Sequence, residues 1–171
     1  CTSNLPEPAV TPSEHFNTLP FDDGEGAKTG VGFQPDLIWF KTRSTAGSHQ
    51  VYDAVRGVQK NLIPDTNVAE GAASTGLLAF GTDGFTIGVD NAVRNTTGDG
   101  MVTYNWKGAN ATVTNTAGNV DTQVSANVDA GFSIVGWPNA ANAVGTRGHG
   151  LSKAPEFMAR KTRSVSGNWC I

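Results

Sequence analysis

The chain repeats part of itself, and this repeat limits its fold more than any other feature of the sequence. Residues 35–44 begin with proline and end in Lys-Thr-Arg-Ser, and residues 155–164 do the same 120 positions later. Upstream, 15–21 aligns with 131–137 at a spacing of 116 positions. Similarity over such lengths indicates a duplicated structural unit. We therefore divide the chain into a linker, a first module and the incomplete start of a second module: 1–14, 15–130 and 131–171.

The composition favours short strands and tight turns. Glycine accounts for 21 of the 171 residues, and apart from alanine the good helix formers are few. Stretches rich in β-branched and aromatic residues are separated by Gly, Asn and Asp. They predict strands at 17–21, 37–42, 49–52, 77–80, 84–89, 101–107 and 132–137, and in the second copy at 157–161 and 169–171. The expected fold is all-β, a β-sandwich or jelly-roll-like module.

Two further segments have expectations of their own. Residues 51–59 are predicted to contain one short helical turn. Residues 112–125, rich in Thr, Asn, Ala and Gly, are predicted to be a flexible connector. The second copy has about 40 residues, too few to fold alone. We expect it to pack on its own chain or, preferably, on a neighbouring subunit.

Charge and hydropathy argue against two classes of partner. Charged residues make up 16% of the chain and the net charge is −3, unlike a nucleic-acid-coating protein. No apolar run approaches the ~20 residues of a membrane span, and no signal peptide is visible. The charge is uneven: 41–64 and 141–171 are basic, whereas 1–40 and 65–140 are acidic. This pattern fits solvated strand faces or patches that dock neighbouring modules.

A catalytic relay can be drawn from Ser44, Ser48, His49 and Asp53, which are close in the sequence. The repeat argues against it, because Trp169 occupies the position of His49 in the second copy, where an indole cannot serve as a base. A glycosidase would need two carboxylates flanking a sugar bond. The fifteen acidic residues are scattered along the chain, and the sequence neither supports nor excludes such a pair. We therefore expect no catalytic residues and no cofactor.

The candidates for a metal site are three histidines and one acidic cluster: His15, His49 and His149, and Asp22, Asp23 and Glu25. Neither set has the spacing of a zinc or a calcium site, so no metal is expected. The cysteines, Cys1 and Cys170, lie at opposite ends, and a bridge between them remains an open alternative.

Aromatic and basic residues near the repeated motif are the candidates for ligand or interface contacts: Trp39, Phe40, Lys41, Arg43, His49, Arg160, Lys161, Arg163 and Trp169. Trp39 and Phe40 align with Ala159 and Arg160, so this position differs between the copies. Such a difference suits a surface or inter-copy contact better than a shared core. A flat aromatic ring beside polar groups also suits a sugar.

Several motifs carry a resemblance to a known family. They are Gly-Phe-Gln-Pro-Asp-Leu-Ile-Trp-Phe-Lys-Thr-Arg-Ser at 32–44, Ser-His-Gln-Val-Tyr-Asp-Ala-Val-Arg-Gly at 48–57, Gly-Phe-Thr-Ile-Gly at 84–88, Ala-Gly-Phe-Ser-Ile-Val-Gly at 130–136 and Gly-His-Gly-Leu at 148–151. The chain resembles the β-rich repeat modules of bacteriophage tail-fibre and virion proteins, many of them marine. In those proteins such modules often follow SPRY-like or laminin-G-like domains, and residues 4–8 resemble the linker after an SPRY-like domain.

The resemblance implies a non-enzymatic structural and adhesive module of a virion appendage such as a tail fibre. Its loops would be presented to a glycan or protein of the host surface. Its partners would be other virion proteins and further copies of itself. The copies would form a homo-oligomer, with a trimer as one alternative. It would be synthesised in the host cytoplasm and located in the virion. The alternatives are a capsid decoration or head-fibre protein bound to the virion lattice and, less favoured, a depolymerising tailspike enzyme.

Overall fold

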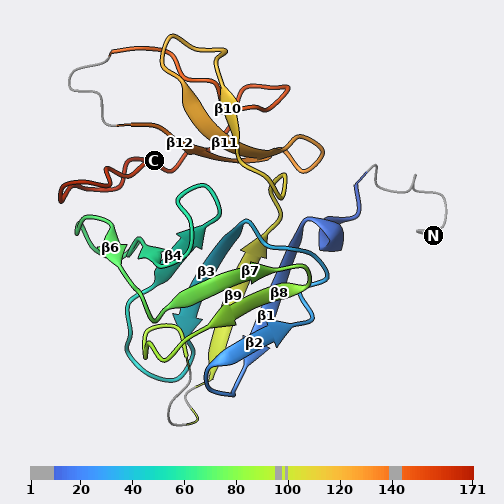
Figure 1. Ribbon diagram of the computed structural model, residues 1–171, viewed down its shortest axis with the longest axis vertical. Coiled ribbons are helices and arrows are strands. Elements are labelled where there is room, and N and C mark those ends of the chain that lie inside the picture. Colours follow the sequence, from blue (N-terminus) through green and yellow to red (C-terminus); the bar gives the residue numbers. More distant parts are fainter. Residues whose placement is uncertain (1–9, 95–97, 99, 139–143) are drawn as a thin grey trace, which may run out of the picture.

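The computed structural model describes residues 10–94, 98, 100–138 and 144–171. The chain forms a two-layered β-sandwich, and a smaller third sheet lies beside it (Figure 1). Most of the predicted linker, with Cys1, lies outside the described residues, so the structure does not address a bridge to Cys170. The end of that linker, Pro12–Glu14, forms the short 3-10 helix η2. No helix in the described part of the chain is long and apolar enough to cross a membrane.

The first layer of the sandwich is a four-stranded antiparallel sheet with the order β1-β9-β3-β4. Its strands are β1 (Phe16–Phe21), β9 (Met101–Trp106), β3 (Leu37–Thr42) and β4 (Gln50–Asp53). The second layer has the order β2-β8-β7, formed by β2 (Gly26–Thr29), β8 (Gly84–Ile87) and β7 (Leu77–Gly81). A short hairpin of β5 (Lys60–Asn61) and β6 (Gly71–Ala72) adjoins β4. The third sheet contains β10 (Val113–Asn115), β11 (Thr122–Asn127) and β12 (Phe132–Gly136).

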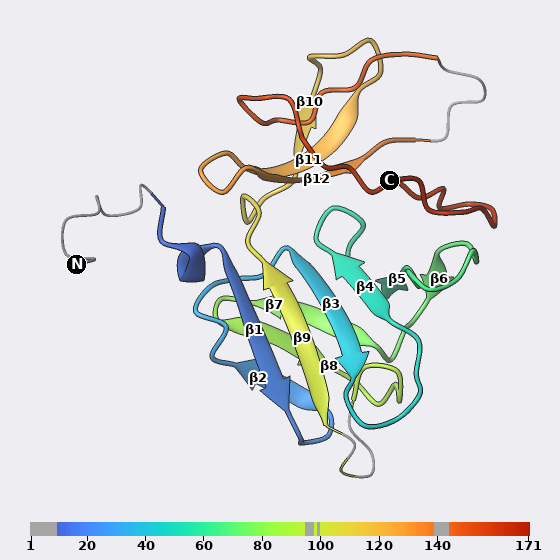
Figure 2. The same cartoon turned by 180° about the vertical axis from the view of Figure 1, so that it is seen from behind.

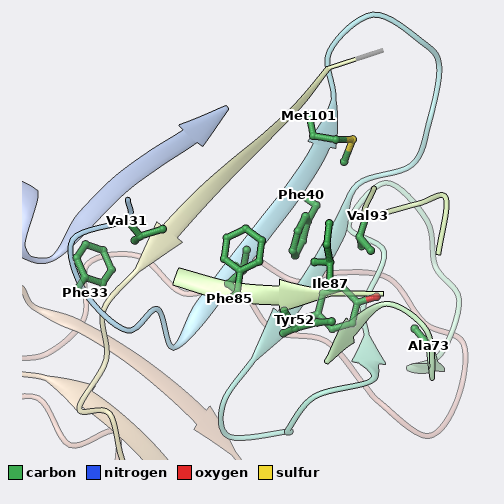
Figure 3. Packing of buried hydrophobic residues seen from close by; sticks show 11 residues of the cluster. Val31, Phe33, Phe40, Tyr52, Ala73, Phe85, Ile87, Val93 and Met101 are labelled. Atoms are coloured by element: carbon green, nitrogen blue, oxygen red, sulfur yellow. The ribbon is translucent and has the colours of Figure 1, made fainter. Parts of the chain in front are cut away.

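The core lies between the two layers and follows from the alternation along the strands (Figure 3). Ile38 and Phe40 of β3 point inward, and the Phe40 ring packs edge-on against Tyr52 and Phe85, with centroids 5.8 and 5.3 Å away. Full burial of one such side chain contributes about 1.5–3 kcal/mol. The all-β sandwich predicted from the sequence is therefore confirmed.

One sequence prediction needs correction, whereas the single turn expected within 51–59 is present. Residues 112–125 are not a flexible connector, because β10 and most of β11 lie there and pair with each other. The chain from 51 onwards continues β4 as far as Asp53. A single hydrogen-bonded turn follows, closed by Gly57 N–H donating to the Asp53 carbonyl at 3.0 Å.

The second copy keeps the pairing of the first but not its full strands. Residues 157–161 and 169–171 form only one antiparallel bridge, between Arg160 and Cys170. That bridge matches the Phe40–Gln50 pair of β3 and β4, shifted by 120 positions. In the first copy, β9 pairs with the other side of β3, and among the described residues no strand plays that part for the second hairpin. This missing neighbour explains why 157–161 does not become a strand.

Candidate binding face

The outer face of the four-stranded sheet presents its side chains in three rows across β1, β9 and β3. In Figure 2 these strands form the front layer of the sandwich. From one end to the other, the rows are Phe16-Trp106-Leu37, Thr18-Tyr104-Trp39 and Pro20-Val102-Lys41. Residues at alternate positions share a face, so these side chains all point away from the core.

Aromatic rings dominate this surface, which we call the aromatic face: Phe16, Trp39, Tyr104 and Trp106. Tyr104 is 40% exposed and Phe16 is 38% exposed. The Trp106 ring lies between two phenylalanines, 4.9 Å from Phe16 and stacked at 6.2 Å on Phe132 of β12. Phe16 and Phe132 occupy equivalent positions of the repeat. The aromatic face therefore extends to the third sheet at the end nearest Phe16.

A hollow lies at that end of the aromatic face. It has a volume of about 440 Å³, and its lining combines aromatic rings with a histidine and a carboxylate: Val10, Pro12, His15, Phe16, Trp106, Asp129, Ala130, Gly131 and Phe132. This size falls within the range of small-molecule sites. Asn127 Nδ2 and His15 Nδ1 form a hydrogen bond at 2.7 Å, so the ring of His15 is held beside the hollow.

The strand β9 directs two polar residues into the sandwich, beside the buried Met101. Thr103 and Asn105 point into the sandwich and are fully buried, whereas Val102, Tyr104 and Trp106 point outward. The buried pair needs hydrogen bonds to compensate. Thr103 Oγ1 and Asn105 Nδ2 make them, whereas Asn105 Oδ1 is buried without a partner among the described residues. Asn105 Nδ2 donates to Thr103 Oγ1 at 3.0 Å, and Thr103 Oγ1 donates to the Leu19 carbonyl at 3.2 Å.

Trp39 is fixed in place by His49. Its indole N–H donates to His49 Nδ1 at 2.7 Å, and the two rings meet edge to face with centroids 5.6 Å apart. The backbone N–H of His49 in turn donates to Asp65 Oδ1 at 3.1 Å. Burial acts to raise the pKa of Asp65, but hydrogen bonds from its own backbone, Ser48 and His49 outweigh it and lower the pKa. His49 is thus a support for Trp39.

The hypothetical relay of Ser44, Ser48, His49 and Asp53 is not assembled. Asp53 is buried and accepts hydrogen bonds from the backbone N–H of Arg56 at 2.8 Å and from its Nε at 2.5 Å. His49 has its Nδ1 occupied by Trp39. The carboxylate therefore orients a guanidinium and not the imidazole.

The acidic cluster of 22–25 is distributed among three different cations. Lys28 contacts Asp23 at 3.1 Å, Arg94 contacts Glu25 at 2.8 Å, and Arg43 contacts Asp22 at 4.0 Å. In the described residues, no group of three or more His, Cys, Asp or Glu side chains could hold a metal ion. His149 is likewise engaged, since its Nδ1 accepts the backbone N–H of Leu151 at 3.1 Å.

The structure separates the candidates that the sequence grouped together. Trp39, Lys41 and His49 lie at the aromatic face. The prediction of Phe40 as a contact residue is wrong, because its side chain is fully buried in the core and cannot contact a ligand. Arg43 is exposed on the turn after β3.

The second-copy candidates lie elsewhere: Arg160, Lys161, Arg163 and Trp169. They belong to residues 157–171, which we call the C-terminal hairpin. This hairpin lies beside β6, at the edge of the sandwich opposite to β1 (Figures 1 and 2). Arg163 forms an ion pair with Glu70. The Trp169 indole N–H is buried without a hydrogen-bond partner among the described residues.

A family model described as a domain of unknown function, DUF7483, matches residues 11–171. The chain belongs to this family. The range of DUF7483 covers the sandwich, the third sheet and the C-terminal hairpin together. Neither the search of curated proteins nor the search of solved structures finds a match.

The sequence reasoning missed four candidate contact residues of this DUF7483 chain: Phe16, Tyr104, Trp106 and Phe132. Their signal was present in 101–106, where Val, Tyr and Trp alternate with Met, Thr and Asn. That alternation shows that the aromatic residues share one face. It does not show which face is buried, and the usual rule of apolar residues inside gives the wrong answer for β9.

Proposed function

We propose that this protein is a non-enzymatic adhesive module that binds a carbohydrate on the aromatic face of its four-stranded sheet. By the resemblance of its motifs, the setting is a virion appendage such as a phage tail fibre, and the ligand is a glycan of the host surface. The contact surface is the sheet face and its hollow, in place of the loops expected from the sequence.

The inward-facing polar pair of β9 is the observation that carries this proposal. A sandwich gains stability by burying aromatic rings and exposing polar side chains, yet this strand buries Thr103 and Asn105 and leaves Tyr104 40% exposed. Sequences that depart from the stable pattern at one place do so characteristically at functional sites. Aromatic rings kept at the surface are therefore interpreted as ligand contacts.

The chemistry of the face suits a sugar. The C–H groups on one side of a pyranose pack against aromatic rings, while its hydroxyls need hydrogen-bonding partners. The face provides both, because Thr18 stands in the row of Tyr104 and Trp39, and Lys41 stands in the neighbouring row. His49 accepts the indole N–H at Nδ1, which leaves its Nε2–H as a donor at the rim.

A glycan array followed by calorimetry on the bound glycans tests the proposal. We expect the wild-type chain to bind at least one class of surface polysaccharide, and Tyr104→Ala and Trp106→Ala each to weaken binding about tenfold or more. The matched control is Phe157→Ala, which removes an aromatic ring that is 71% exposed on the C-terminal hairpin. Absence of glycan binding, or equal affinities for Tyr104→Ala and wild type, would contradict the proposal.

A further inference from the structure

The two copies of Lys-Thr-Arg-Ser fold into the same turn. We call them the first turn and the second turn: residues 41–47 and 161–167. In the first turn, Thr42 Oγ1 donates to the Thr45 carbonyl at 3.1 Å, and in the second turn Thr162 Oγ1 donates to the Val165 carbonyl at 3.5 Å. Each turn connects the two halves of the same antiparallel bridge. The chain therefore presents one recognition element twice.

The second turn is docked on the loop before β6, which we call the acceptor loop: residues 67–70. Arg163 donates two parallel hydrogen bonds to the Glu70 carboxylate, from Nε to Oε2 at 2.8 Å and from Nη2 to Oε1 at 3.0 Å. The Glu70 backbone N–H donates back to the Arg163 carbonyl at 2.9 Å. Gly167 N and Lys161 Nζ both donate to the Asn67 carbonyl, at 2.8 and 3.2 Å.

The acceptor loop is held from its buried side, independently of the second turn. Arg56 Nη1 contacts Glu70 Oε2 at 3.3 Å and donates to the Lys60 carbonyl at 3.1 Å. The same guanidinium is anchored on the buried Asp53. Because Arg56 orients Glu70, the carboxylate stays positioned for a second guanidinium when Arg163 leaves.

The first turn offers the same chemistry to solvent. Residues 43–48 are all exposed, and the Arg43 side chain is 54% exposed. Its ion-pair partner, Asp22, is 4.0 Å away and itself exposed, so the pair lacks the two-pronged geometry of Arg163 and Glu70. Among the described residues, a hollow of about 460 Å³ borders the turn at Thr45, Gly47 and Ser48.

We propose that the first turn docks on the acceptor loop of a second copy of this chain, in the same way that the second turn docks within the chain. Each chain has two turns and one acceptor loop, so one turn is always left to contact a neighbour. The contact joins different surfaces of the two copies and therefore builds a head-to-tail array. Within one chain, the second turn competes for the loop with the advantage of a high effective concentration.

Removing that competition gives the test. Arg163→Ala, made in the full chain, releases the acceptor loop while leaving the first turn intact. In sedimentation velocity over a wide concentration range, we expect Arg163→Ala to associate about tenfold or more tightly than wild type, and the association to weaken with salt. The double variant Arg43→Ala/Arg163→Ala is expected to lose that gain.

The double variant is the matched control, because both variants undock the second turn and carry the same exposed apolar side chains on the C-terminal hairpin, among them Phe157 and Val165. Association that persists without Arg43 would come from those side chains and would overturn the proposal. So would a folded Arg163→Ala that associates no more than wild type. If Arg163→Ala does not fold, Arg163→Lys takes its place, because lysine keeps the charge but cannot make the two parallel bonds to Glu70. The same comparison with and without Arg43 then applies.

Discussion

Arg56 uses its whole guanidinium inside the protein. Its Nε bonds the buried Asp53, its Nη2 donates to the Val51 carbonyl at 3.0 Å, and its Nη1 reaches Glu70. One side chain thus connects the end of β4, the β5–β6 hairpin and the acceptor loop. Because a buried ion pair repays its desolvation only when complete, its two members depend on each other.

This dependence predicts unequal effects of single and double substitutions. We expect Arg56→Met to lower the free energy of unfolding by about 3–5 kcal/mol, since it leaves the Asp53 carboxylate buried without a cation. Asp53→Leu/Arg56→Met removes both charges and is expected to cost less than the single change. Urea denaturation of the three proteins measures this. A double variant less stable than Arg56→Met would show that Asp53 stabilises the fold even without its cation, and would contradict this dependence.

At the scale of elements, the docking of the C-terminal hairpin depends on the charge of Glu70. Burial acts to raise the pKa of Glu70, but hydrogen bonds and charge interactions with Arg163 and Arg56 outweigh it, so the pKa lies below its ordinary value of 4.5. A carboxyl whose pKa is lowered by folding contributes stability above the unfolded value. That contribution is lost as the pH falls below 4.5 and through the folded pKa.

The hairpin should therefore undock in acid. We expect the NMR signal of the Gly167 amide, which donates to Asn67, to move toward its random-coil position as the pH falls below 4.5. The variant Glu70→Gln has no ionisable group at this position, so it should show no such transition. A Gly167 signal that follows the same pH course in both proteins would assign the change to another group.

The sequence predicted some elements well for reasons that can be named. Residues 37–42 form β3 as expected, because Pro35 precedes a clear alternation of inward and outward side chains. The strands β5 and β6 were missed since each has only two residues, and β10 and β11 since their Thr, Gln, Ser and Asn resemble a linker. The aromatic face could not be derived from the sequence, because the buried partners of Thr103 and Asn105 decide which face of β9 points inward.

At the scale of the whole molecule, the sandwich and the C-terminal hairpin differ in how they are held. Every member of the buried hydrophobic cluster comes from residues 31–101. The third sheet is attached through Asp36, which is fully buried and accepts hydrogen bonds from Ser125 Oγ at 2.7 Å and Asn110 N at 2.8 Å. Residues 148–150 cover part of that sheet, since Thr122 Oγ1 donates to Gly148 O at 2.8 Å. Beyond them, the contacts to the sandwich are mainly polar.

Removal of residues 154–171 should accordingly leave the sandwich and the third sheet folded. The deletion removes an ion pair in which the Arg163 side chain is 40% exposed, and a few hydrogen bonds. Together these contribute about 1–2 kcal/mol. Phe157, Met158 and Ile171 are largely exposed, so little apolar packing is lost with them. We expect the shortened chain to keep the near-ultraviolet circular dichroism of its buried aromatic residues and to unfold in one transition at a slightly lower temperature. Loss of that cooperative transition would show that the hairpin belongs to the folding unit of the sandwich.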